Sequence, residues 1–111
     1  MVDSLMIYDL REIETAREFC NLDREARMGL VKSALVRVLS RHRGNVAYIR
    51  PRHIALELGM ARWAAIVKKI AKCLNEIGEV RADGVTWRLE KIEVRKTRGK
   101  ERMYFIYVRV N

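Results

Sequence analysis

The residues in this sequence best suited to do chemistry are basic side chains that recur along one segment near the middle of the chain. At about 100° per residue, the segment from Arg62 to Ile77 divides into two faces. The apolar face consists of Trp63, Ile66, Val67, Ile70, Cys73, Leu74 and Ile77. The opposite face consists of Ala64, Ala65, Lys68, Lys69, Lys72 and Asn75, with Arg62 at its edge and Glu76 as its one acid. We expect a core-facing side and a side that attracts polyanions. A solvated lysine face is the plainer alternative.

The residue types on the basic face favour contacts to phosphate over the reading of bases. Base reading needs fixed hydrogen-bond patterns, typically Arg or Lys to guanine and Asn or Gln to adenine. At the leading end of the segment only Arg62 can make a bidentate contact, whereas Ala64 and Ala65 offer methyl contacts or close approach. The pattern predicts phosphate-dominated binding with limited sequence choice.

Two further basic clusters lie outside this segment. Four cations surround Gly99 in a polar turn, where Glu101 is the single acid. They are Lys96, Arg98, Lys100 and Arg102. They favour a contact to phosphate or to a minor groove, although charged turns are often merely soluble. Arg50 and Arg52, beside His53, lie where a helix begins, and the positive end of a helix dipole favours phosphate. Exposed loop charge is the alternative for this second cluster.

No motif indicates catalysis, a cofactor or a metal. The sequence lacks a Gly-rich phosphate loop, a G-x-S-x-G elbow and a local metal-ligand pattern, so we expect no enzyme and no small-molecule substrate. Cys20 and Cys73 are expected as two buried free thiols. A disulfide between them is the alternative, because the absence of Gln, the single Pro and the many Arg and Glu residues are typical of thermophiles. With His42 and His53 the two cysteines lack the spacing of structural zinc.

Composition and charge bound the class of protein. The 111 residues are 50% hydrophobic and 33% charged, which suits one folded domain. No apolar run is long enough to span a membrane and the start lacks a basic signal region, so we expect a cytoplasmic protein without membrane contact. The formal net charge is +9, yet residues 1–22 carry five acids against two arginines. This step predicts an acidic N-terminal arm or helix (1–22) before the domain (23–111).

Hydrophobic periodicity predicts the elements that position these residues. A helix is expected over 23–41, a short strand over 46–49, a helix from Pro51 through Leu58 and a helix over 62–77. Gly59 and Gly78 are expected to end the second and third of these helices, Gly78 in the left-handed conformation. Alternation over 85–110, with a slip near Lys91, predicts one long hairpin with a bulge and a turn at 97–100.

The order helix, strand, helix, helix, hairpin, together with RPRHIALELGMARWAAIVKKIAKCLNEIGEV, resembles the winged helix-turn-helix superfamily. Ala55 lies where such units hold a small residue, Gly59 follows four residues later in the turn, and Ile66 and Ile70 form the apolar seam of the next helix. The resemblance implies an α+β fold with a three-helix core and a C-terminal wing. It also implies that helix 62–77 enters the major groove of double-stranded DNA, while the wing touches the backbone or the minor groove.

The resemblance leaves the role of such a domain open. A transcriptional regulator or an architectural DNA-binding protein is the first expectation. The alternative is a winged-helix module for contact with protein or RNA in a transcription, replication or ribosomal assembly.

The C-terminal segment suggests a partner. The run from Met103 to Val110 is apolar on both alternating faces, so one face needs a cover that the N-terminal segment or a second subunit could supply. A homodimer would also place two basic helices on one duplex. Six aromatic residues could form a stacking platform for single strands, namely Tyr48, Trp63, Trp87, Tyr104, Phe105 and Tyr107. Trp63 and Trp87 lie on faces assigned to the core, so packing is the expectation for these two, which weakens the case for a stacking platform.

Overall fold

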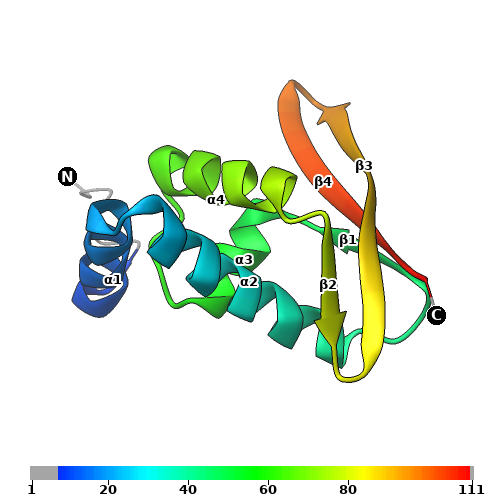
Figure 1. Cartoon of the computed structure of the whole chain (residues 1–111). Coiled ribbons are helices and arrows are strands. Elements are labelled where there is room, and N and C mark those ends of the chain that lie inside the picture. The colour runs from blue at the N-terminus through cyan, green and yellow to red at the C-terminus, as the bar shows by residue number, and fades with distance from the viewer. Residues whose placement is uncertain (1–7, 111) are drawn as a thin grey trace.

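Four helices lie on one side of a four-stranded antiparallel sheet in the computed structural model, which describes residues 8–110 (Figure 1). The fold class is therefore α+β, as predicted. In chain order the elements are α1 (Leu10–Asn21), α2 (Arg24–Arg41), β1 (Val46–Ile49), α3 (Pro51–Glu57), α4 (Ala64–Glu76), β2 (Glu79–Ala82), β3 (Val85–Thr97) and β4 (Lys100–Arg109).

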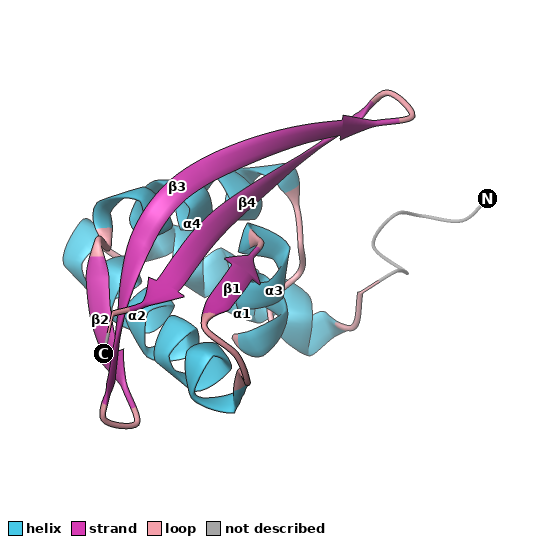
Figure 2. Cartoon of the chain, turned by 90° about the vertical axis from the view of Figure 1, so that its right-hand side faces the viewer, coloured by secondary structure: helices cyan, strands magenta, loops and turns pink. Residues whose placement is uncertain are grey.

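The sheet has the strand order β1-β4-β3-β2. The long hairpin of β3 and β4 is confirmed, and its register shifts between Leu89 and Lys91, where the alternation predicted a bulge. Beyond the bulge the hairpin extends past the helices to a free tip (Figure 2).

Strand β2 was not predicted, and it adds an element to the expected order. Val80 pairs with Trp87 across a tight turn in which Asp83 and Gly84 both have positive φ angles, 55° and 79°. Asp-Gly is a preferred pair for two-residue hairpin turns. The alternation of Glu79 to Ala82 followed by Asp-Gly was therefore a local signal for this strand.

Helix ends follow the capping residues in most places. Asp9 and Glu12 form a reciprocal capping box at the start of α1, and the Asp23 side chain accepts a hydrogen bond from the Ala26 N–H in α2. Gly59 adopts φ 69° directly after α3, as its predicted role requires. The prediction for Gly78 is wrong because it has no positive φ. Ile77 ends α4 in an extended conformation.

The core lies between the helices and the inner face of the sheet. Trp87, Phe105 and Tyr107 are buried there against apolar side chains of α2, α3 and α4, including Leu35, Ile54, Ile66, Ile70 and Leu74. Ala16 and Phe19 of α1 belong to the same cluster. The expected arm is thus a helix in its described part, and it shares its core with the segment after residue 22.

Tyr107 connects β4 to the end of α4. Its hydroxyl shares its proton between the carbonyl oxygens of the C-cap residue Ile77, at 3.1 Å, and of Leu74, at 3.4 Å, and the Leu74 carbonyl also accepts from the Ile77 N–H at 3.2 Å. Burial raises the pKa of Tyr107 well above its ordinary value, so the hydroxyl keeps its proton and remains a donor.

Helix α1 does not cover the outer face of the sheet. The N-terminal segment was one of the two covers expected for it, the other being a second subunit. Helix α1 packs at the far end of the helical layer, where the Ala61 N–H donates to the Glu12 carbonyl at 3.0 Å (Figure 1). Ile106 is buried on the outer face, whereas Val46 and Tyr48 are exposed there. No helix within residues 8–110 is long and apolar enough to cross a membrane.

Candidate nucleic-acid interface

Helix α4 presents one basic face to solvent and one apolar face to the core. Ile66, Ile70, Cys73 and Leu74 are buried, and Ala64, Ala65, Lys68, Lys72 and Asn75 are exposed. This division agrees with the predicted faces, except that Trp63 and Val67 of the apolar face and Lys69 of the basic face are half-buried. Trp63 precedes the helix as its N-cap, so α4 begins two residues later than expected.

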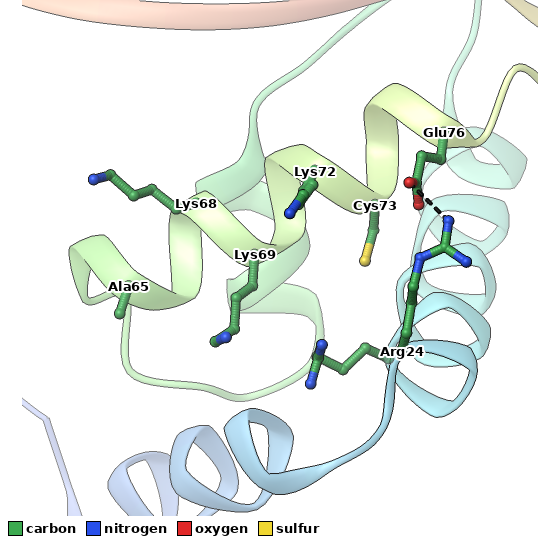
Figure 3. A pocket seen from close by; sticks show the side chains of 8 residues that line it. Arg24, Ala65, Lys68, Lys69, Lys72, Cys73 and Glu76 are labelled. Carbon is green, nitrogen blue, oxygen red and sulfur yellow. Dashed lines mark ion pairs between the residues drawn. The ribbon is translucent and has the colours of Figure 1, made fainter.

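A cleft of 390 Å³ lies between α4 and the first turns of α2 (Figure 3). We call it the basic cleft. Its lining residues are Arg24, Arg27, Ala65, Lys68, Lys69, Lys72, Cys73 and Glu76. Arg24 pairs with Glu76 at 2.7 Å, and that carboxylate raises the pKa of Arg24. The acid expected on the basic face is therefore neutralised by an arginine from another helix.

Sequence reasoning missed Arg24 and Arg27 as members of this surface. They lie on α2, and α2 reaches α4 only through the tertiary fold. Arg27 is fixed in place by its hydrogen bond to the carbonyl of Leu22, the residue that caps the end of α1. No local pattern distinguishes these two arginines from other solvated helix charges.

A second hollow, of 540 Å³, lies between the hairpin, α3 and α4, and we call it the hairpin groove. It is lined by Arg50, Pro51, Arg52, Ala64, Val67, Lys68, Ala71, Val94, Lys100, Glu101, Arg102 and Met103. The structure thus brings members of all three predicted basic clusters to one groove. Lys68 lines both hollows and connects them across α4.

The hairpin tip is a two-residue turn of Arg98 and Gly99, with φ angles of 52° and 79°. All six residues from Thr97 to Arg102 are exposed. Lys96 is the one predicted tip cation with an acidic partner in the described chain, because its Nζ lies 3.6 Å from Glu101 Oε1. Arg98, Lys100 and Arg102 form no ion pair within residues 8–110.

Arg62, the predicted base-reading residue, is held by α1. Its guanidinium lies 3.4 Å from the Glu12 carboxylate, donates to the Met60 carbonyl at 3.2 Å, and lies over the ring of Tyr8 at 5.0 Å from the centroid. The side chain is only 19% exposed. The sequence placed Glu12 in a separate acidic arm, and only its packing position pairs it with Arg62.

Ion pairing separates the cations of α4 from several others. Arg37 and Arg41 of α2 both bind the Glu57 carboxylate, at 3.0 and 2.5 Å, and their hydrogen bonds lower the pKa of Glu57. In contrast, Lys68 and Lys72 have no acidic partner within the part of the chain that the structure describes, and the same is true of Lys69 and Arg52.

The remaining candidate chemistry is sparse. Cys20 and Cys73 are free thiols with no disulfide between them; Cys73 is buried as expected, whereas Cys20 is only half-buried. Burial raises the pKa of Cys73, which keeps it a neutral thiol at the floor of the basic cleft. Within residues 8–110, no three His, Cys, Asp or Glu side chains come together in a way that could hold a metal.

The six aromatic residues divide between the two faces of the sheet and the helices. Trp87 is buried, as predicted, and so are Phe105 and Tyr107, whereas Trp63 is only half-buried. Tyr48 and Tyr104 instead lie on the outer face, where their rings meet edge to face with centroids 6.2 Å apart.

Comparisons with known proteins provide no family assignment. No protein-family description matches the chain, and no curated protein sequence matches it significantly. No solved structure matches it significantly either. The interpretation of the site therefore rests on the geometry and chemistry of its own residues.

Proposed function

We propose that this chain is a winged-helix protein that binds double-stranded DNA mainly through its phosphates. In this proposal α4 lies in the major groove and the β3–β4 hairpin is the wing. The observation that carries it is the basic face of α4, where the exposed Lys68 and Lys72 and the half-buried Lys69 have no acidic partner in the described chain. The basic cleft and the hairpin groove extend this charge to either side of the helix.

Limited sequence selectivity follows from what the leading end of α4 exposes. Ala64 and Ala65 are exposed there and can offer only methyl groups to bases. Arg62 is occupied by Glu12 and the Tyr8 ring. A transcriptional regulator or architectural protein with weak base preference fits this arrangement better than a finely selective repressor. A homodimer that places two α4 helices on one duplex stays a prediction.

Reversing the charge of the α4 lysines tests the proposal. The triple variant K68E/K69E/K72E should reduce affinity for a random-sequence duplex by more than about 100-fold, because it removes several phosphate contacts and adds repulsion. Fluorescence anisotropy measures the affinity, and circular dichroism confirms that the exposed substitutions leave the fold intact.

The matched control is R17E/K32E/R43E, which has the same net charge as K68E/K69E/K72E. These three cations are exposed and line neither hollow. The control should bind with only a few-fold loss. Equal losses in both triple variants would mean that net charge alone governs binding and would contradict the role of α4. A clear preference of the parent for structured RNA would favour the protein- or RNA-interaction alternative.

A further inference from the structure

A second surface with nucleic-acid chemistry lies on the outer face of the sheet, opposite to the helices (Figure 2). It consists of Tyr48, Arg50, Arg95 and Tyr104, which we call the tyrosine–arginine cluster. The Arg95 guanidinium lies 4.9 Å from the ring centroid of Tyr104 and 5.4 Å from that of Tyr48. Arg50 lies 5.8 Å from the Tyr104 centroid. Three adjacent strands, with the residue that follows β1, thus present two rings and two guanidinium groups together.

The exposure of this cluster is not explained by packing of the core. Tyr48 is 48% exposed and lies on β1, an edge strand of the sheet. Val46, two residues earlier on the same face, is also exposed. The helices bury the other face of these strands, where Ala47 and Ile49 are found. An aromatic ring left half in water at an edge is available to a ligand that offers a flat apolar surface.

The charge of the outer face indicates that such a ligand is anionic. By strand register this face carries Arg81, Arg88, Lys91, Arg95, Lys100 and Arg102. The acids on the same strands of this face are Glu79 and Glu93, with Glu90 in the bulge beside Arg88. Cations therefore exceed acids around the rings. Glu93 pairs with Arg95 and Lys91, which orients Arg95 over the two tyrosines.

We propose that this face binds single-stranded nucleic acid, with bases stacked on Tyr48 and Tyr104. Every base has a flat π-surface, and the combination of exposed aromatic rings with a basic surface is how proteins bind single strands without sequence preference. Arg50 and Arg95 stack on the same bases or contact the flanking phosphates. A duplex hides its base faces and gains little from exposed rings. The site shares Arg50, Lys100 and Arg102 with the lining of the hairpin groove, but Tyr48 and Tyr104 line neither hollow, so their loss distinguishes it from the α4 surface proposed for duplex DNA.

The test uses a fluorescent oligothymidine of about 15 nucleotides, which is long enough for a site of this kind. The parent protein should bind it, and Tyr48→Ala should weaken binding by about tenfold or more, because one stacked base is lost. Tyr48 is the chosen position because an exposed edge residue can be truncated without unfolding the core. Tyr48→Phe should retain the affinity, since stacking needs the ring and not the hydroxyl.

Two controls separate this proposal from a structural effect and from the proposed duplex site. Val46→Ala truncates another exposed residue of the same strand face and should leave oligothymidine binding unchanged. Tyr48→Ala should leave duplex affinity unchanged, whereas K68E/K69E/K72E should lose duplex binding and retain most oligothymidine binding. A thermal melt of each variant checks that it is folded.

Several outcomes would overturn the proposal. They are no binding of oligothymidine by the parent, an affinity of folded Tyr48→Ala equal to that of the parent, or equal loss in Val46→Ala. Loss of single-strand binding in the α4 triple variant alone would assign that binding to the duplex surface. Repeating the titration with oligouridine shows whether the natural strand is DNA or RNA, since stacking alone favours neither.

Discussion

At the scale of single residues, Glu12 performs two tasks that the sequence shows separately. One carboxylate oxygen accepts a hydrogen bond from the Asp9 N–H and completes the capping box of α1. The other lies 3.4 Å from the Arg62 guanidinium, just before α4. The cap fixes the side chain, and the fixed side chain holds the arginine. Arg62 thereby contributes to the docking of α1 and is withheld from the basic face.

Arg98 shows a different kind of residue-level compromise. It has φ 52° in a two-residue turn, a conformation that Gly, Asn and Asp adopt more readily than arginine. A side chain with a Cβ costs about 1 kcal/mol or more in this region. No ion pair of Arg98 within residues 8–110 offsets this conformational strain. We therefore propose that Arg98 contacts phosphate.

The first prediction at this scale concerns Arg98→Asn. It should raise the free energy of unfolding by about 0.5–1 kcal/mol, because asparagine tolerates the left-handed conformation. It should also weaken duplex binding several-fold, because one cation is lost from the tip. Urea denaturation and duplex anisotropy measure the two effects. A variant that is stabilised with no loss of affinity would remove Arg98 from the proposed interface.

At the scale of elements, the position of α4 depends on the sheet behind it. The Tyr107 hydroxyl from β4 binds the carbonyls of Leu74 in α4 and of its C-cap residue Ile77, and β4 also forms the hairpin with β3. The helix and the proposed wing are therefore attached to one strand. Their relative placement, which defines the hairpin groove, is set by that strand.

The prediction at this scale concerns Tyr107→Phe, which removes the hydroxyl and leaves the ring in place. The free energy of unfolding should fall by about 1–2 kcal/mol, because the Ile77 carbonyl loses its buried donor, whereas the Leu74 carbonyl keeps its hydrogen bond from the Ile77 N–H. Urea denaturation measures the change. The fold should persist, since the aromatic packing is retained. An unchanged free energy of unfolding would show that water replaces the hydroxyl at no cost.

At the scale of the whole molecule, charge is distributed unevenly over the fold. Residues 1–22 are acidic on balance while the chain as a whole carries +9. The described part of the acidic segment packs at one end of the helical layer, and the hairpin that carries the tip cations projects from the other end of the molecule (Figure 1). This separation gives the molecule a field that orients a polyanion toward α4 and the hairpin.

The prediction at this scale concerns salt. If Lys68, Lys69, Lys72, Arg98, Lys100 and Arg102 each neutralise one phosphate, log affinity should fall against log salt with a slope of roughly −5, at about −0.9 per phosphate. Duplex titrations between about 50 and 200 mM salt should then show a loss on the order of a thousandfold. A slope near zero would contradict a phosphate-dominated complex.

The sequence by itself determined the faces and limits of most elements. Apolar spacing on α4, alternation along β3 and β4, the bulge near Lys91 and the turn at Arg98-Gly99 are local patterns, which depend on residues a few positions apart. The α+β class and the basic face of α4 follow from them. Strand β2 could also have been predicted from the sequence, because its alternation and its Asp-Gly turn are local signals.

Only the tertiary structure decided which distant residues meet. Arg24 and Arg27 join the α4 lysines, Glu12 holds Arg62, and the two apolar faces of β4 receive different environments. Tyr107 is buried under the helices, whereas Tyr104 meets Tyr48 and the arginines outside. Periodicity states that a residue lies on one face of its own element, but the neighbour of that face depends on how all elements pack at once.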